Sequence, residues 1–594
     1  MNAGRKVGYF GVDYYPEHWP EERWLEDARL MQEAGFNVVR LAEFAWAKME
    51  PAEGLFDFTW LHKVIELLHS KGISILLGTP TAAAPAWLMQ AHPEIFRVND
   101  QRQRITFGSR QFMCVNAPAF RKAAHRIVTA MAAEFGNHEA VIGWQIDNEF
   151  GPLCYCDVCQ IAFQEWLKTK YGTLDSLNEA WGTVFWSQIY SDWRQIPLPW
   201  ATSQPLNPGL YLDFRRFMTD SYISFQREQI EIVRSHSPGR FVTHNFMGFF
   251  ADALDYHRLA EDLDFVSWDN YPQVWHAENV AATALSHDYT RGMKRKSFWV
   301  MEQQSGPGGW GWMGPCPAPG KLREWTREAI ARGAEGIIYF RWRPARFGIE
   351  QNWHGILNHD GSRSRRYEEI KDTIREIKSG DVPSPIPKPD IAILVDANSR
   401  FAFQLQPSSS QFSYFDHVLF YYRTLYQMGK HVDVIPAGSD LSDYRCVIAP
   451  SLYVLKKTTA ENIIDFVRAG GKLITTFRTG VKDEYSRIVN EPLPGLLREV
   501  CGVQVEEYHS PLPDEPNWIR GMVPQLPFEP TPARIWVDVL QPTTADAVAE
   551  YITGFGSGYT AIALNRYGSG VAMYIGTSIE KSILTGCLDL IDSL

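Results

Sequence analysis

Two glutamates and an asparagine stand where they could act together on a sugar. Asn148 and Glu149 lie in the segment QIDNEFG, and Glu302 lies far along the chain in VMEQQSG. Two carboxyl groups about 5–5.5 Å apart can break a glycosidic bond with retention, one protonating the leaving oxygen and the other attacking the anomeric carbon. An adjacent asparagine could hydrogen-bond the sugar 2-hydroxyl. Each glutamate alone could be a salt-bridged rim residue, but the three together favour catalysis.

Four cysteines form a second group with the spacing of metal ligands. Cys154, Cys156 and Cys159 form C-x-C-x2-C shortly after Glu149, and Cys114 lies upstream in RQFMCVN. In a chain kept in a reducing compartment, clustered cysteines indicate metal ligands before disulfides. Four thiolates leave no open position for water, so the pattern predicts a structural Zn²⁺ that clamps two loops. The alternative is a loop with incidental thiols.

The elements that must position these residues alternate between strand-like and helical patterns. Helical periodicity is seen, for example, in the shared face of Trp24, Ala28 and Met31. Eight strands, each followed by a helix, predict a (β/α)8 barrel rather than a doubly wound open sheet. Strands four and seven of such a barrel face each other across its mouth, which would bring Glu149 to Glu302. The expected strands are Val7–Tyr15, Val38–Trp46, Ser74–Pro80, Val141–Phe150, Arg240–Phe246, Phe265–Tyr271, Ser297–Gln304 and Gly336–Trp342.

A proline-rich stretch divides the chain. Prolines alternate with other residues over 383–389, which favours a stiff linker between a catalytic barrel at 1–382 and a second α/β domain at 390–594. Strand and helix patterns restart after it in a flavodoxin-like or amidotransferase-like order. The turn after KLITTF reads RTGV, without the cysteine that an amidotransferase would need, so we expect a structural role for this domain.

Composition narrows the function further. The chain has 594 residues, 13% of them aromatic, and a formal net charge of −11. This acidic balance argues against nucleic acid or an anionic membrane as partner. No apolar run is long enough to span a bilayer, and the N-terminus has no signal-peptide pattern, so a cytoplasmic location is expected.

The sequence resembles the β-galactosidases of glycoside hydrolase family 42. The segments that carry the resemblance are GVDYYPEHWP, RLAEFAWAKMEPAEGLFDF, QIDNEFG with CYCDVCQIAFQEWLKTKYGTLDSLNEAWG, and EQQSGPGGW. The resemblance implies Glu149 as acid/base and Glu302 as nucleophile. It also implies galactose contacts at Arg110, Asn148, Trp186, Tyr271 and Trp310, with a further Glu–His pair that we place at Glu350 and His354.

The same resemblance implies a homotrimer, in which one subunit helps to wall its neighbour's site, and a cysteine zinc site that some members carry. Members commonly end in a further small β domain, of which we expect little or nothing here. Independently of the resemblance, Tyr271 could orient Glu302 from the end of strand six. Arg40, at the end of strand two, is similar to an arginine that supports the nucleophile in related glycosidases, although a structural ion pair is nearly as good an interpretation.

The sequence therefore predicts a retaining exo-β-galactosidase that releases terminal β-D-galactose from a small β-galactoside or galacto-oligosaccharide. Its chemistry is expected to need no metal. One alternative is a retaining glycosidase that prefers α-L-arabinopyranosides or β-D-fucosides. A second, of another class, is a non-catalytic, zinc-stabilised carbohydrate-binding protein.

Overall fold

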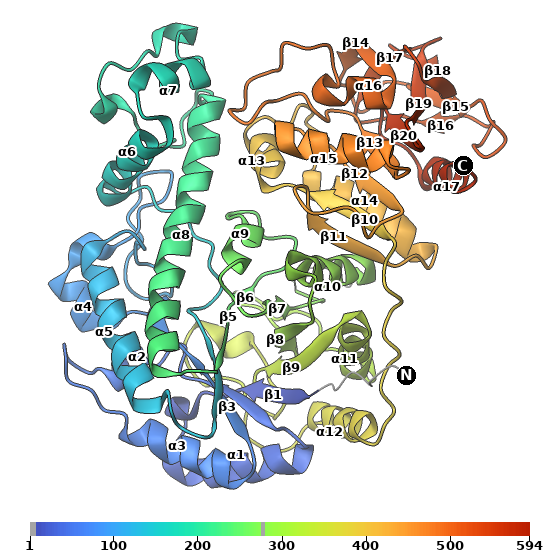
Figure 1. Cartoon of the computed structure of the whole chain (residues 1–594). Helices are drawn as coiled ribbons and strands as arrows, with labels where there is room; N and C mark the ends of the chain where they lie inside the picture. The colour runs from blue at the N-terminus through green and yellow to red at the C-terminus, as the bar shows by residue number, and fades with distance from the viewer. Residues whose placement is uncertain (1–7, 275–278) are drawn as a thin grey trace. The chain divides into compact units, whose positions relative to one another are not determined.

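The computed structural model describes residues 8–274 and 279–594. Its contacts group the chain into two compact units (Figure 1). Unit 1 holds the chain up to Trp166, Trp200–Thr202 and Arg216–Ile386, whereas unit 2 holds Leu167–Pro199, Ser203–Arg215 and Pro387–Leu594. In the described residues no helix combines the length and the apolar character needed to cross a membrane.

Unit 1 is built on a parallel sheet that closes on itself. The strand order is β5-β4-β3-β2-β1-β9-β8-β7-β6, and His244 alone separates β5 from β6. The two ends of the order are therefore halves of one interrupted strand, and the sheet forms a barrel with eight strand positions, as predicted. The strands are β1 (Tyr9–Asp13), β2 (Val38–Leu41), β3 (Ser74–Gly78), β4 (Val141–Gln145), β5 (Phe241–Thr243), β6 (Asn245–Phe246), β7 (Ser267–Asn270), β8 (Phe298–Gln304) and β9 (Ala334–Phe340).

Apolar strand residues fill the barrel. Val38, Leu76, Met301 and Ile338 come from four different strands, and each is fully buried in one cluster. Both faces of a parallel barrel strand are covered, which explains why these strands are nearly continuous apolar runs. At Gly336 the ring of Trp299 occupies the space that a Cβ atom would need, so a larger residue there would displace it.

Helices cover the outside of the barrel with their predicted apolar faces. In α1 (Glu21–Ala34), Trp24, Ala28 and Met31 are buried, and the helix ends at Gly35 in the left-handed conformation. The other helices of this unit lie between its strands in the chain, except α12, which follows the last strand (Figure 1). They are α2 (Trp46–Met49), α3 (Thr59–Ser70), α4 (Ala86–Ala91), α5 (Pro118–Phe135), α9 (Tyr256–Ala260), α10 (Val280–Lys294), α11 (Lys321–Arg332) and α12 (Arg365–Lys378), with α6 (Asp157–Tyr171) and α8 (Pro208–His236) running on into residues of unit 2.

Unit 2 has a mixed sheet, ordered β11-β10-β12-β13-β20-β19-β18-β15-β16, that is parallel from β11 to β20 and antiparallel beyond. The strand and helix patterns expected after the linker are found, beginning with β10, and the segment KLITTF forms β13. Residues 381–389 form no helix or strand. The strands are β10 (Ile391–Val395), β11 (Val432–Pro436), β12 (Cys446–Ala449), β13 (Lys472–Thr476), β14 (Val503–His509), β15 (Trp518–Gly521), β16 (Thr531–Pro532), β17 (Val537–Pro542), β18 (Asp546–Thr553), β19 (Thr560–Tyr567) and β20 (Gly570–Ile575). The helices are α7 (Leu174–Trp181), α13 (Ala397–Leu405), α14 (Tyr414–Gln427), α15 (Lys457–Arg468), α16 (Arg498–Cys501) and α17 (Lys581–Asp592).

Candidate active site and metal centre

Three buried carboxyl groups meet at the ends of the barrel strands. Glu149, Asp269 and Glu302 each place a carboxylate oxygen within 4.8 Å of the other two. They are 8%, 1% and 4% exposed. The separation of Glu149 from Glu302 is compatible with the close spacing of a retaining pair. Sequence reasoning did not single out Asp269.

The turn that carries Glu149 has an unusual backbone. Asp147 and Glu149 both have positive φ, 52° and 47°, which costs free energy for residues other than glycine. Side chains of neighbouring strands hold this turn: Asp147 N–H donates to Thr79 Oγ1 at 2.7 Å, and Glu149 N–H donates to Asn245 Oδ1 at 3.2 Å. Strain that the surroundings fix in place is typical of functional sites.

Glu302 is surrounded by donors. The fully buried Arg40 places Nη2 at 2.6 Å from Glu302 Oε1, and the hydroxyl of Tyr271 donates to Oε2. Arg40 is fixed in turn by Asp13, whose Oδ1 lies 2.6 Å from Nε, and by Gln145, whose Oε1 accepts from Nη1 at 2.9 Å. Both contacts to Glu302 suit a carboxylate, the form that a nucleophile requires.

Glu149 lies in a different electrostatic setting. Burial raises the pKa of its carboxyl above the usual range, Arg110 opposes that rise, and the charge of Glu302 adds to it. Arg110 Nη2 and Asn148 Nδ2 approach Glu149 Oε2 at 2.5 and 3.2 Å. A glutamate kept protonated beside an ionised one is the arrangement that proton donation to a leaving group needs.

His244 supports the same turn from the break between β5 and β6. Its Nδ1 donates to the carbonyl of Ile146 at 2.7 Å, so Nε2 is free to accept from the N–H of Phe150 at 3.2 Å. Burial lowers the pKa of His244 to about 4, so the ring stays neutral and this pair of hydrogen bonds persists near neutral pH. The residues around His244 in the chain do not indicate this anchoring role.

The other residues expected to contact galactose are dispersed. Trp310 is 46% exposed, and its ring lies 6.3 Å from that of Trp353, which in turn lies 4.9 Å from Tyr271, so an aromatic row leads from Glu302 outward. Sequence reasoning missed Trp353. Trp186 is 67% exposed and belongs to unit 2, so the structure does not place it in the same unit as the carboxyl cluster.

The expected Glu–His pair lies beyond β9 in the same unit as the carboxyl cluster. Glu350 Oε2 accepts from Arg341 Nη1 at 3.1 Å. His354 is half-buried, and burial lowers its pKa below the usual value. The guanidinium of Arg341 also lies over the ring of Tyr15, 4.5 Å from its centroid. Glu350 is therefore oriented by an arginine that the sequence did not single out.

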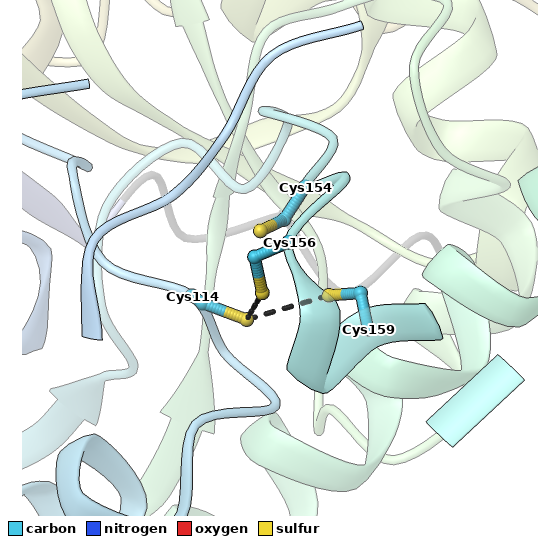
Figure 2. Close-up of side chains that lie close together, drawn as sticks. All are labelled: Cys114, Cys154, Cys156 and Cys159. Atoms are coloured by element: carbon cyan, nitrogen blue, oxygen red, sulfur yellow. Dashed lines mark hydrogen bonds between the residues drawn. The ribbon is translucent and has the colours of Figure 1, made fainter. Parts of the chain in front are cut away.

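The four cysteines expected to bind a metal do converge (Figure 2). Cys114 comes from the segment before α5, Cys154 and Cys156 precede α6, and Cys159 lies in its first turn. All four are buried and free of disulfides, and their sulfurs lie within 4.8 Å of one another. Figure 2 shows them pointing towards a common centre.

The geometry of this cysteine cluster fits a tetrahedral metal. Cys114 Sγ lies 3.4 Å from Cys159 Sγ and 3.6 Å from Cys156 Sγ. A regular tetrahedron with a Zn–S distance of about 2.3 Å would separate the sulfurs by about 3.8 Å. Asn116 donates to Cys159 Sγ at 3.4 Å and to Ser221 Oγ at 3.0 Å, the kind of outer contact that orients a metal ligand. The cluster could therefore bind a metal ion.

Comparison with known proteins agrees with the geometry. The family model for glycoside hydrolase family 42, described as β-galactosidase, matches residues 13–380, and the model for the β-galactosidase trimerisation domain matches residues 389–592. A β-galactosidase of Clostridium cellulovorans is 41% identical over 580 residues, 96% of this chain and 86% of that protein. One of Thermus thermophilus is 41% identical over 537 residues, 87% of this chain and 82% of that protein.

Comparison with solved structures also finds β-galactosidases. The β-galactosidase of Bacillus circulans sp. alkalophilus matches with a TM-score of 0.95 and 33% identity, over 100% of this chain and 89% of that one. That of the haloarchaeon Halorubrum lacusprofundi matches with a TM-score of 0.94 and 36% identity, over 98% and 89%. The chain belongs to the β-galactosidases of glycoside hydrolase family 42.

Proposed function

We propose that this β-galactosidase is a retaining exo-enzyme that removes terminal β-D-galactose by double displacement, with Glu302 as nucleophile and Glu149 as acid/base. The observation that carries the proposal is the pair of carboxyl groups within 4.8 Å of each other, one held by Arg40 and Tyr271 and the other with a raised pKa. Small β-galactosides and galacto-oligosaccharides are the proposed substrates.

In the first step, Glu302 attacks the anomeric carbon while Glu149 donates its proton to the glycosidic oxygen. The aglycone leaves, and a covalent galactosyl-enzyme remains. Arg40 and Tyr271 hold the attacking carboxylate in one orientation, so it needs no rearrangement as the bond forms. Asn148, which accepts from Asn245 Nδ2 at 3.0 Å through its Oδ1, keeps its amide group beside the acid/base, where it can bind the 2-hydroxyl.

In the second step, Glu149, now ionised, removes a proton from water as the water attacks the anomeric carbon. The bond to Glu302 breaks, and galactose leaves with its original anomeric configuration. We propose Arg110, Trp186, Trp310, Glu350 and His354 as further galactose contacts.

Removing each carboxyl group separately tests the two roles. We expect Glu302→Gln to lower kcat on an aryl β-galactoside at least about 10³-fold, because no covalent intermediate can form. For Glu149→Ala, an activated aryl galactoside should still form the intermediate, and added azide should then give β-galactosyl azide, detected by NMR.

The matched control is Glu350→Gln, which should mainly raise KM. Unchanged hydrolysis by Glu302→Gln, or an α-configured azide from Glu149→Ala, would overturn the assignment. Rates on aryl β-D-galactoside, α-L-arabinopyranoside and β-D-fucoside decide which of these related sugars the site prefers.

We propose that the cysteine cluster holds a structural Zn²⁺ through Cys114, Cys154, Cys156 and Cys159. Four thiolates would fill the coordination sphere, so the ion would hold two segments together and take no part in either displacement step. Four closely placed free thiols would oxidise in a disulfide-forming compartment, which supports a cytoplasmic location.

We further propose that the chain acts as a homotrimer, with a catalytic barrel at 1–382 and a trimerisation domain at 390–594. The match of residues 389–592 to a trimerisation domain supports this proposal. The segment 167–199, which carries Trp186, groups with unit 2 by its contacts.

A further inference from the structure

A cavity lies wholly within unit 2, and none of the carboxyl groups of the proposed reaction lines it. Its volume is about 680 Å³. One wall comes from residues 181–208, including Trp181, Phe185 and Trp186, and the other from residues 406–488. Among the described residues that line it are two cations, Arg478 and Lys482, and no aspartate or glutamate.

The cations project from the carboxyl ends of parallel strands. Arg478 and Lys482 follow β13 by two and six residues, and Tyr453, whose ring lies near both charges, follows β12 by four. The chain crosses from one side of β10 to the other between β11 and β12, so these ends lie beside a change of direction in strand order. In open α/β sheets, ligands bind outside the carboxyl ends of the strands at such a point.

Arg478 occupies the turn where an amidotransferase would carry its nucleophile. It has a φ of +64°, a strained value for a residue other than glycine. Its guanidinium lies over the rings of Tyr453, Tyr508 and Trp536, at 5.1, 5.3 and 4.8 Å from their centroids. Its buried Nε has no hydrogen-bond partner in the described part of the chain. This turn therefore presents a fixed positive charge in place of a nucleophile.

Lys482 adds a second buried charge. It is 2% exposed, and its Nζ donates to Gln406 Oε1 at 2.6 Å and to Ser486 Oγ at 3.1 Å, which are neutral partners. The ammonium lies 4.9 Å from the ring of Tyr453. Although burial raises the pKa of Tyr453, the charges of Arg478 and Lys482 outweigh it and lower that pKa.

The acids that could neutralise this pair have other partners. Asp483 pairs with Arg487 at 2.8 Å. Asp538 accepts from Trp536 Nε1 at 2.7 Å and from Tyr574 OH at 2.8 Å. Buried charges are normally paired, so two cations facing a cavity without a carboxylate indicate that an anion completes the site.

We propose that this cavity binds an organic anion, with its phosphate or carboxylate group between Arg478 and Lys482 and its ring against Phe185. The cavity is far larger than an inorganic ion needs. The ring of Phe185, which is 64% exposed, offers the flat apolar face that a sugar or aromatic ring would cover. The site is separate from the carboxyl cluster and does not depend on the chemistry proposed for it.

Calorimetric titration of the full-length protein tests the site. Excess galactose is kept in all solutions to fill any neutral-sugar site, and the probes are galactose 6-phosphate, galacturonate and inorganic phosphate. We expect one binding event per chain for a sugar anion, weakened as salt is raised. Comparing galactose 6-phosphate with galacturonate shows whether the site prefers a phosphate or a carboxylate group. Comparing galactose 6-phosphate with inorganic phosphate shows how much the sugar ring adds to the affinity.

Two variants localise the binding. Lys482→Met and Arg478→Gln should each weaken the preferred probe at least about tenfold, a change expected when one of two charged contacts is lost. The matched control Lys388→Met removes an exposed charge in the linker and should leave affinity unchanged. Absence of binding by all three probes up to about 10 mM, or unchanged affinity in both cavity variants, would overturn the proposal.

Discussion

At the scale of single residues, the environment separates two chemically identical side chains. Glu302 is held by Arg40 and Tyr271, while Glu149 meets Arg110 with its pKa raised by burial. Asp269 adds a third carboxyl group, and burial together with the charges of Glu302 and Glu149 raises its pKa well above the usual value. If Asp269 is protonated, the two glutamates can lie close to each other without repulsion from a third negative charge.

Arg110 should set the alkaline limit of activity. Because its charge lowers the pKa of Glu149, Arg110→Met should raise that pKa. Glu149 would then stay protonated to higher pH, and the alkaline limb of kcat/KM should move to higher pH. The measurement is a pH profile of kcat/KM on an aryl β-galactoside.

KM should rise in the same variant if Arg110 contacts galactose. Arg102→Met is the matched control, because Arg102 stacks on Trp200 with its guanidinium 4.9 Å from the ring centroid. Arg102→Met should leave the alkaline limb of the kcat/KM profile unchanged. A limb that stays fixed, or moves to lower pH, in Arg110→Met would contradict the role given to Arg110.

At the scale of elements, the connections after β3 and β4 depend on each other. Cys114 belongs to the first and Cys154 to the second, and Tyr155 N–H also donates to the carbonyl of Val98 at 2.8 Å. Tyr222 OH donates to the carbonyl of Pro152 at 2.7 Å, close to Glu149 in the chain. A metal at the cysteines would therefore restrain the segment that follows the acid/base.

Removing one sulfur ligand should loosen this segment. We expect Cys159→Ser to lower bound zinc from about one to near zero per chain, and to lower the melting temperature by several degrees, because metal affinity adds to folding free energy. Zinc is measured by elemental analysis and melting by calorimetry. A chelator should lower the melting temperature of the parent protein but not that of Cys159→Ser.

Cys316→Ser is the matched control, since Cys316 is an exposed cysteine outside the cluster. It should change neither zinc content nor melting temperature. A parent protein that contains no zinc when purified without chelator, or one that keeps its melting temperature after chelation, would rule out the clamp.

At the scale of the whole molecule, the carboxyl cluster and the Trp186-bearing segment belong to different compact units. Trp186 and its neighbour Phe185 are large aromatic residues left exposed by their own unit. Exposed aromatic residues are typical of surfaces that contact another chain or a ligand. A site completed by a second copy would account for both observations.

We therefore expect the protein to elute with the mass of three chains in light scattering coupled to size exclusion. Trp186→Ala should raise KM more than it lowers kcat, because a stacking residue binds the sugar without taking part in bond breaking. Glu179→Gln, a substitution in α7 close to Trp186 in the chain, is the control. A mass of one chain at micromolar concentration would contradict the trimer.

The sequence by itself determined the barrel fold and the strand ends at which the candidate catalytic residues lie. Strand periodicity, the eight repeats of strand and helix, and the carboxyl groups at strand ends are local patterns, and the closed topology follows from them. The spacing of Cys154, Cys156 and Cys159 is also a local pattern, whereas Cys114 lies far from them in the chain. These features could be predicted because each depends on residues close together in the chain.

Only the tertiary structure decided the rest. Distant segments pack around Arg341, Trp353 and His244, and nothing in the neighbouring sequence distinguishes these three from ordinary core residues. Asp269 lies near the end of a strand, but only the fold brings its carboxyl group to those of Glu149 and Glu302. The raised pKa of Glu149 and the cation-lined cavity of unit 2 likewise depend on burial and on charges brought from other strands. Burial and long-range electrostatics are properties of the folded chain, so no local pattern records them.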